Sequence, residues 1–333
     1  MITDAARCVY EMSGGRENKE VGTMHPIPST MKSPRDIRPV WRGGVLQIWV
    51  TRACDLACTH CTQGSNLAGK PGMMTPDQFE EACKSLVGYF GVVGMFGGNP
   101  CVHPQFDELC AIMRKYIPFE QRGLWSNNLN GHGKTCRKTF NPDVSNLNVH
   151  QSEAAYEEML TDWPLCQPKG LEDDSRHSPT MVAMQDMEDM TDDERWTLIG
   201  DCDVNQRWSA LIGVFRNELR GWFCELAGAQ AMLHEAEGDY PDTGHRIVPG
   251  WWNHDIQDYA EQVRFHCFAC GHPMRGQGDW AGSGTTEQVS KTHANIYKLK
   301  KPHGKTIQLI TRRDQLGGSV VAATQYLPGE RGE

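Results

Sequence analysis

The chain has 333 residues, of which 33 are Lys or Arg and 42 are Asp or Glu, so its formal net charge is −9. This acidic balance argues against a protein that coats nucleic acid nonspecifically. Hydrophobic residues make up 39% of the chain and charged residues 23%, which excludes a disordered chain and is typical of a globular one. The length suits one large domain or two modest ones.

Neither a membrane span nor a signal peptide is indicated. The longest uncharged stretch, residues 86–106, is interrupted by glycines and prolines, whereas a lipid-spanning helix is apolar throughout. The first 20 residues have no apolar segment after a basic start. We therefore expect a cytoplasmic protein without membrane contact. Its 13 cysteines are unusually many, and we expect cysteines to serve here as metal ligands rather than in disulfides.

The first half of the chain predicts a parallel sheet. Residues 1–44 are polar and interrupted by prolines, and we interpret them as an irregular N-terminal extension. From residue 45, strands and helices alternate, a pattern typical of parallel sheets that are open or partly closed into a barrel. Thr75 and Pro76 mark a helix start, and a second helix is predicted over 105–116. The predicted strands are 45–50, 92–96, 123–125, 147–149 and 181–184.

The second half has a different pattern. Apolar runs at 208–215 and 219–224 predict a β-hairpin, and a helix is predicted over 227–237. The acidic run 186–194 is interpreted as a solvated helix face. Residues 282–286 form a small-residue linker. The segment 291–333 holds eight Lys or Arg and three Asp or Glu, which predicts a solvated basic hairpin or, alternatively, a contact surface for an anionic partner.

Three cysteines directly after the first strand carry the strongest signal. Cys54, Cys58 and Cys61 form a C-x3-C-x2-C motif. Three thiolates on one short loop can hold three irons of a [4Fe–4S] cubane and leave the fourth iron open to another ligand. Half of a zinc site is the alternative, but zinc prefers four ligands and no fourth cysteine lies close in sequence.

This motif resembles the signature of the radical S-adenosylmethionine superfamily, with His60 where that family usually has an aromatic ring. The resemblance implies that S-adenosylmethionine chelates the open iron through its amino and carboxylate groups. One electron from the cluster then breaks the sulfonium C–S bond, and the resulting 5′-deoxyadenosyl radical takes a hydrogen atom from the substrate. A low-potential flavodoxin or ferredoxin is the implied electron donor.

Further positions match the family in order. Gly97, Gly98, Asn99 and Pro100 follow the second strand, where the family has a Gly-Gly-Glu-Pro segment near the amino group of the cofactor. Glycines let backbone carbonyls approach a ligand closely. Asn99 departs from the usual Glu and removes a carboxylate there. After the third and fourth strands, Asn127 is expected to help seat the cofactor and His150 to lie near a ribose-facing position; a structural histidine is the alternative for His150.

A second set of cysteines consists of Cys202, Cys224, Cys267 and Cys270, the last two in a C-x2-C metal-knuckle spacing. Their order around the predicted hairpin and helix resembles the Twitch domain, the shorter form of the SPASM domain, in which four thiolates hold an auxiliary [4Fe–4S] cluster. A four-cysteine zinc site is the alternative. His266 and His272 flank the pair, and either could replace a thiolate.

Together these features predict an α/β fold: a partial (β/α)6 TIM-like barrel followed by a small α+β Twitch-like cluster domain. The expected divisions are an N-terminal extension at 1–44, the barrel at 45–195, the cluster domain at 196–280 and a basic tail at 281–333.

The expected activity is radical modification of a small molecule such as a sugar, by dehydrogenation, epimerisation or rearrangement. Modification of a nucleotide or nucleic-acid base is an alternative, and the basic tail is the only feature of the sequence that supports it. Modification of a peptide ranks lower. Peptide-modifying relatives usually have a leader-binding domain near the N-terminus, and residues 1–44 are too short and too often interrupted by prolines to form one. A non-enzymatic reading also remains: a zinc-bearing interaction protein, with Asn99 as its best support.

Overall fold

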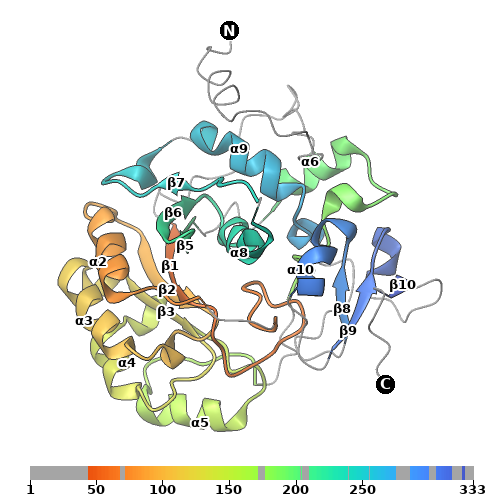
Figure 1. Ribbon diagram of the computed structural model, residues 1–333. Helices are drawn as coiled ribbons and strands as arrows, with labels where there is room; N and C mark the ends of the chain where they lie inside the picture. Colours follow the sequence, from red (N-terminus) through yellow and green to blue (C-terminus); the bar gives the residue numbers. More distant parts are fainter. Residues whose placement is uncertain are drawn as a thin grey trace.

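The computed structural model describes residues 44–67, 72–171, 177–202, 204, 210–238, 240–254, 256–274, 286–299, 305–316 and 325–326. Most of the predicted N-terminal extension and of the 282–286 linker therefore lies outside the described residues. A seven-stranded sheet with strand order β4-β3-β2-β1-β5-β6-β7 organises the molecule. Helices α2 to α5 form an arc around one face of this sheet, and α8 lies on the other side (Figure 1).

The first half of the sheet is parallel, as its alternating strands and helices predicted. Strands β1 to β4 pair in parallel. Thr75 caps the first helix through a reciprocal capping box with Gln78, which satisfies backbone N–H groups at the helix start. The strands are β1 (Val45–Thr51), β2 (Val92–Gly97), β3 (Arg122–Ser126) and β4 (Asn146–Leu147), and the helices are α2 (Pro76–Ser85), α3 (Phe106–Tyr116), α4 (Gly133–Thr139) and α5 (Glu153–Asp162).

The fifth strand predicted over 181–184 is wrong. These residues form a turn that leads into a 3-10 helix, Met184–Asp186. Met181 is buried against Leu67, Leu233 and Val289 rather than against the sheet. A short apolar run is equally compatible with a buried turn, and only the tertiary contacts decide between them.

The predicted hairpin is confirmed as β5 (Ala210–Phe215) and β6 (Glu218–Trp222), which pair antiparallel. Arg216 and Asn217 both have positive φ angles, 51° and 64°, which suit a two-residue turn between twisted strands. β5 also pairs in parallel with β1. The hairpin therefore continues the same sheet as β1 to β4, so the two predicted domains share one sheet. Their boundary at 195, and the closure into a six-fold barrel, stay predictions.

Several shorter elements follow the hairpin. β7 (His245–Arg246) pairs antiparallel with β6 and ends the sheet. The predicted helix over 227–237 is present as α8 (Glu225–His234) with a 3-10 turn after it. Helix α6 (Asp192–Gly200) precedes the hairpin, and α9 (Ala260–Gln262) continues into a π-helix, Val263–Cys267. Among the described residues, no helix has the length and apolar character needed to cross a bilayer.

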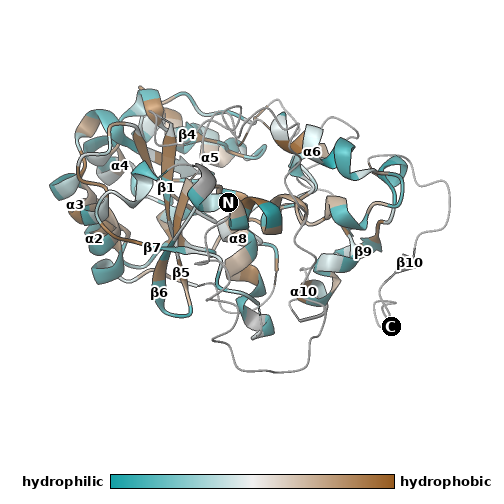
Figure 2. Cartoon of the chain, turned by 90° about the horizontal axis from the view of Figure 1, so that it is seen from above, coloured by the Kyte–Doolittle hydropathy of each residue, from teal (hydrophilic) through white to brown (hydrophobic). Residues whose placement is uncertain are grey.

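The hairpin predicted within 291–333 is present in part, because β9 (Thr306–Leu309) and β10 (Gln325–Tyr326) pair antiparallel. It is not a separate solvated hairpin: β9 also pairs in parallel with β8 (Thr286–Val289), and α10 (Ala294–Leu299) lies between these two strands in the chain. We call residues 286–316 the C-terminal module. Val289, Tyr297 and Ile307 bury its apolar side against Leu67 and Leu233. Figure 2 shows α8 between the main sheet and α10 of this module.

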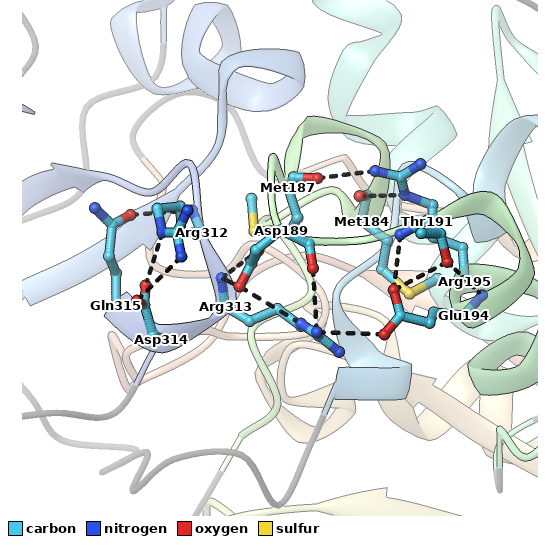
Figure 3. A network of polar contacts seen from close by, with 10 residues as sticks. All are labelled: Met184, Met187, Asp189, Thr191, Glu194, Arg195, Arg312, Arg313, Asp314 and Gln315. Carbon is cyan, nitrogen blue, oxygen red and sulfur yellow. Dashed lines mark hydrogen bonds and ion pairs between the residues drawn. The ribbon is translucent and has the colours of Figure 1, made fainter.

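The acidic run 186–194 is not a solvated helix face, because most of it precedes α6 and binds the C-terminal module (Figure 3). The Asp189 carboxylate accepts the backbone N–H of Arg313 at 3.0 and 3.1 Å, and its carbonyl accepts from the Arg313 guanidinium at 3.1 Å. Asp186 accepts from the Ser290 hydroxyl at 2.5 Å and from the backbone N–H of Thr292 at 2.7 Å. These carboxylates anchor the module to the rest of the chain.

We expect Asp186→Ala to destabilise the protein by about 2 kcal/mol, because it removes charge-assisted hydrogen bonds and leaves their donors without a partner. Equilibrium urea unfolding measures the loss. The control is Asp314→Ala: that carboxylate is 65% exposed, lies 3.4 Å from Arg312, and should contribute less than about 0.5 kcal/mol. Equal losses in the two variants would contradict the anchoring role of Asp186.

Candidate active site

The cysteine triplet lies on the loop that follows β1, which we call the cysteine loop (residues 52–67). Cys54, Cys58 and Cys61 are free, partly exposed thiols. All three line a cavity of about 350 Å³. Soft thiolate donors that face one cavity suit an iron–sulfur cluster or another thiophilic metal group.

The opposite wall of the cavity comes from the ends of neighbouring strands. Because the carboxyl ends of parallel strands meet at one edge of a sheet, residues far apart in sequence gather there. The structure thus brings Gly97, Gly98, Asn127 and His150 together with the triplet. The lining from these strand ends is Phe96, Gly97, Gly98, Trp125, Ser126, Asn127, Asn146, Asn148 and His150, and other segments add His177, Glu225, Leu226 and His272.

Gly97 and Gly98 let the cysteine loop pass directly against the end of β2. Gly97 has a φ of +146°, and a Cβ on it would lie 2.1 Å from the Thr51 carbonyl oxygen. A Cβ on Gly98 would lie 2.3 Å from the carbonyl oxygen of Ala53. The N–H groups of Gly98 and Asn99 donate to the carbonyls of Thr51 and Ala53 at 2.8 and 2.7 Å. The glycine pair therefore holds the start of the loop that carries Cys54.

Asn99 and Pro100 do not line this cavity. Asn99 is fully buried, and its side-chain oxygen accepts from the Cys101 N–H at 3.0 Å and the Ser126 hydroxyl at 2.8 Å. Its amide group donates to the Asn128 carbonyl at 3.0 Å and to the Asp55 carboxylate at 3.2 Å. Pro100 is the first residue of a buried 3-10 turn. Asn99 therefore acts on protein groups, among them a carboxylate of the cysteine loop.

That carboxylate, Asp55, was missed by the sequence analysis. It accepts hydrogen bonds from three side-chain amides: Asn127 at 2.8 Å, Asn128 at 3.1 Å and Asn99. Asp55 is exposed, and its Oδ1 lies 3.7 Å from the Cys54 sulfur. No Lys, Arg or His within the described ranges forms an ion pair with it. Neutral amides thus fix an anionic group beside the first cysteine.

The three histidines near the loop differ in their placement. His150 lines the cavity, and its ring lies edge-on to His177 with centroids 5.3 Å apart. Burial lowers the pKa of His150 to about 4 and also lowers that of His177, so both rings are neutral near pH 7. His60 does not line the cavity; it is buried, and its N–H donates to the Glu287 carboxylate at 3.1 Å.

Electrostatics disfavours bare thiolates at the triplet. Burial raises the pKa of Cys58 to about 12, and it raises that of Cys54 strongly. Each neighbouring cysteine raises these pKa values further, because adjacent thiolates repel one another. Iron ions supply the positive charge that such a set of thiolates lacks, so metal binding and thiol deprotonation are coupled here.

The second cysteine set also gathers in space. Cys202 follows α6, and Cys224 is at the N-cap position of α8. Cys267 ends the π-helix, Val263–Cys267, that continues α9, and Cys270 follows it. All four are buried. Burial raises the pKa of Cys224, and the charges of Cys202 and Cys270 add to that shift. These thiols therefore lie within electrostatic reach of one another.

The two flanking histidines are placed differently. The His266 ring nitrogen Nε2 lies 2.8 Å from the Thr243 hydroxyl, and the ring packs against Tyr240 and Phe265. His272 lines the cavity that Cys54, Cys58 and Cys61 face, and its backbone N–H donates to the Cys270 sulfur at 3.4 Å. Within the described part of the chain, no three His, Cys, Asp or Glu side chains are grouped closely enough to hold a single metal ion. Iron–sulfur and zinc both stay open as predictions for this second set.

Comparison with known families agrees with the first motif. Residues 48–159 match the family model of the Radical SAM superfamily. This segment, about a third of the chain, runs from β1 to α5 and contains the triplet, the glycine pair, Asp55 and Asn127. That family implies a [4Fe–4S] cluster and S-adenosylmethionine. The search of curated proteins gives no significant match.

Solved structures show only distant likeness. BtrN in complex with AdoMet and 2-DOIA has a TM-score of 0.42 and 14% identity, covering 68% of this chain and 92% of that chain. Streptococcus suis SuiB bound to precursor peptide SuiA has a TM-score of 0.26 and 14% identity, covering 43% of this chain and 33% of that chain. At these TM-scores the likeness supports no conclusion about this protein.

We expect Gly98→Ala to displace the cysteine loop, because the new methyl group would collide with the carbonyl oxygens of Ala53 and Arg52, 2.3 and 2.7 Å away. The cost should be about 1–3 kcal/mol of stability, together with reduced iron uptake during anaerobic reconstitution. The matched control is Gly200→Ala, at a position with no atom within 4 Å of the added Cβ. Full iron uptake by Gly98→Ala would show that the loop tolerates the shift.

Proposed function

We propose that this protein is a radical S-adenosylmethionine enzyme that takes a hydrogen atom from a small-molecule substrate. The observation that supports this most strongly is the cavity in which Cys54, Cys58 and Cys61 face Gly97, Gly98 and Asn127. These residues belong to the segment that matches the Radical SAM superfamily model.

The residues of the cavity have separate tasks in this proposal. The three cysteines hold three irons of a cubane, and the absence of a fourth cysteine in the motif leaves one iron for the cofactor. When bound, the cluster and S-adenosylmethionine supply a 5′-deoxyadenosyl radical. Gly97 and Gly98 keep the wall beside the loop free of side chains, and Asn127 offers an amide group to bound molecules. The neutral rings of His150 and His177 limit the access of water.

Asp55 provides a carboxylate close to the position where Asn99 lacks one. The family carries a carboxylate at the fourth position of the strand-end segment, near the cofactor's amino group, whereas this chain carries an amide. The Asn99 amide donates to Asp55 at 3.2 Å, so a carboxylate is present one hydrogen bond away from position 99, on the cysteine loop. Asp55 lies beside the cavity rather than among its lining residues. We infer that it supplies the negative charge for the cofactor's ammonium group. The zinc-bearing, non-catalytic alternative thereby loses its main support.

The lining of the cavity favours a polar small molecule. Asn146, Asn148, His150, His177 and Glu225 offer hydrogen-bonding groups, while Trp125 and Leu226 offer apolar contact. Hydroxyl-rich compounds such as sugars or amino sugars fit this mixture, because each hydroxyl both donates and accepts hydrogen bonds.

A nucleic-acid substrate is the weaker alternative. The basic segment 291–333 was its only support, and two of its described cations bind within the protein. Arg313 pairs with Asp189 and Glu194, and Lys305 lies beside Glu287 and Thr59. Side chains engaged in this way are not available to neutralise phosphates.

The second cysteine set completes the proposal. We infer that Cys202, Cys224, Cys267 and Cys270 hold an auxiliary [4Fe–4S] cluster, supported by their common burial and mutual charge effects. Such a cluster either accepts an electron during a dehydrogenation or supports substrate binding. The proposed donor of the first electron is a low-potential flavodoxin or ferredoxin.

The direct test is the formation of 5′-deoxyadenosine from S-adenosylmethionine by the anaerobically reconstituted, dithionite-reduced protein. We expect product from the wild-type chain and none above background from Cys58→Ser, whose cluster lacks one iron ligand. Cys166→Ser is the control, because that buried cysteine belongs to neither set. Iron content should be about eight per chain if both sets hold cubanes. A wild-type protein that binds iron but yields no 5′-deoxyadenosine would overturn the proposal.

The role of Asp55 is tested by moving the carboxylate from position 55 to position 99. Asp55→Asn should weaken S-adenosylmethionine binding about tenfold, the size of one lost charge-assisted interaction. The double variant Asp55→Asn with Asn99→Glu returns a carboxylate to the neighbouring position and should restore most of the affinity. Equilibrium dialysis of the iron-loaded protein measures binding without turnover.

The probe for comparison is 5′-methylthioadenosine, which lacks the ammonium group. Its affinity should be the same in wild type and in Asp55→Asn. If both ligands lose affinity equally, Asp55 only shapes the loop, and its inferred contact with the ammonium group is wrong.

A further inference from the structure

A buried pair of opposite charges from the C-terminal module lies against the cysteine loop. Glu287 is in the middle of β8, and Lys305 directly precedes β9, the parallel partner of β8. The parallel pairing places the Lys305 ammonium 3.9 Å from the Glu287 carboxylate. The side-chain exposures are 7% for Lys305 and 0% for Glu287. Both groups are therefore held away from solvent. Burial raises the pKa of Glu287 to about 7, so its carboxylate is fully charged only above that pH.

Glu287 binds the loop on both sides of Cys61. Its carboxylate accepts the backbone N–H of His60, with both oxygens 3.1 Å from that nitrogen. It also accepts from the Asn66 side-chain amide at 2.5 Å, and it shares a hydrogen bond with Tyr297. These contacts join residues 221 to 227 positions apart in sequence. The carboxylate thus fixes the part of the loop that carries the third cysteine.

Lys305 binds the residue between the second and third cysteines. Its ammonium group donates to the Thr59 hydroxyl at 2.5 Å, and the Thr59 carbonyl lies 3.0 Å from the His177 ring nitrogen Nδ1. Thr59 adjoins Cys58, and His60, which donates to Glu287, adjoins Cys61. The cation and the anion therefore both contact residues between the second and the third cysteine.

We propose that Lys305 and Glu287 are positioning residues that set the reduction potential of the iron–sulfur cluster held by Cys54, Cys58 and Cys61. This inference rests on the function proposed above. Reduction adds one negative charge to the cluster. A buried cation next to the loop that holds the cluster stabilises the reduced form, and a buried anion there destabilises it. Solvent screens these effects little, because both groups are buried.

Packing alone does not require these charges. Burial of two ionised groups costs free energy, and well-packed neutral side chains often replace such pairs without loss of stability. The contacts of Glu287 with the His60 N–H and the Asn66 amide need a hydrogen-bond acceptor, which glutamine also provides. The position of the charges beside the cysteines is what a role in redox tuning requires.

The test is an electron paramagnetic resonance-monitored redox titration of the full-length, iron-loaded protein, at a pH well above the Glu287 pKa of about 7. Lys305→Met should lower the midpoint potential, and Glu287→Gln should raise it. Each change should alter the reduced-to-oxidised ratio at a fixed potential about tenfold, on the order of 59 mV for a one-electron couple. The double variant Lys305→Met with Glu287→Gln removes both charges and should return close to the wild-type potential.

Two controls separate charge from structure. Lys305→Arg keeps the cation and should keep the potential, and Lys291→Met removes an exposed cation of the same module and should leave the potential unchanged. The double variant is electrically neutral at this site, so it remains informative if Lys305→Met alone fails to fold.

The outcomes distinguish this inference from the proposed function. Opposite shifts in the two single variants support the tuning role. Equal potentials in all variants, or shifts of the same sign in both single variants, would overturn it while leaving the radical chemistry in place. A wild-type protein that takes up no iron at Cys54, Cys58 and Cys61 would overturn the proposed function itself.

Discussion

The candidate site depends on the path of one loop that carries three cysteines and is held at both ends. Its start is hydrogen-bonded to the end of β2, where the N–H groups of Gly98 and Asn99 donate to the carbonyls of Thr51 and Ala53. Its far part is held by Glu287 of the C-terminal module. A loop with so little freedom can present three thiols to one cavity before any metal binds, which reduces the entropy lost when a cluster assembles.

The C-terminal module consequently belongs to the site, although it is remote in sequence. The acidic residues Asp186 and Asp189 anchor it from one side, and Leu67 and Leu233 pack against its apolar face. The cost of burying Glu287 is offset by donors from the loop and by Lys305. The arrangement links the stability of the module to the position of Cys61, because the same carboxylate serves both.

Local signals in the sequence predicted the elements well. The alternation after residue 45 predicted β1 to β3 and the helices between them. Thr75 and Pro76 marked a helix start, because an N-cap and a proline at the first helical position involve only neighbouring residues. The spacing of Cys54, Cys58 and Cys61 indicated a cluster for the same reason. By contrast, the pairing of β5 with β1 and the contact between Glu287 and His60 depend on residues more than 150 positions apart. No local pattern encodes such partners, so the packing of the module against the rest of the chain was missed and its strands were predicted as a solvated hairpin.

Asn99 illustrates how the two levels combine. In the sequence, Asn99 stands where the family has a carboxylate. In the structure, it is one of three amides that hold Asp55 beside Cys54.

The central claim is that Cys54, Cys58 and Cys61 hold a cluster with an iron open to S-adenosylmethionine. The most direct measurement is the electron paramagnetic resonance spectrum of the reduced, iron-loaded protein before and after addition of S-adenosylmethionine. We predict a change in the signal of this cluster, because the cofactor enters its coordination sphere; an unchanged spectrum at saturating S-adenosylmethionine would contradict the claim.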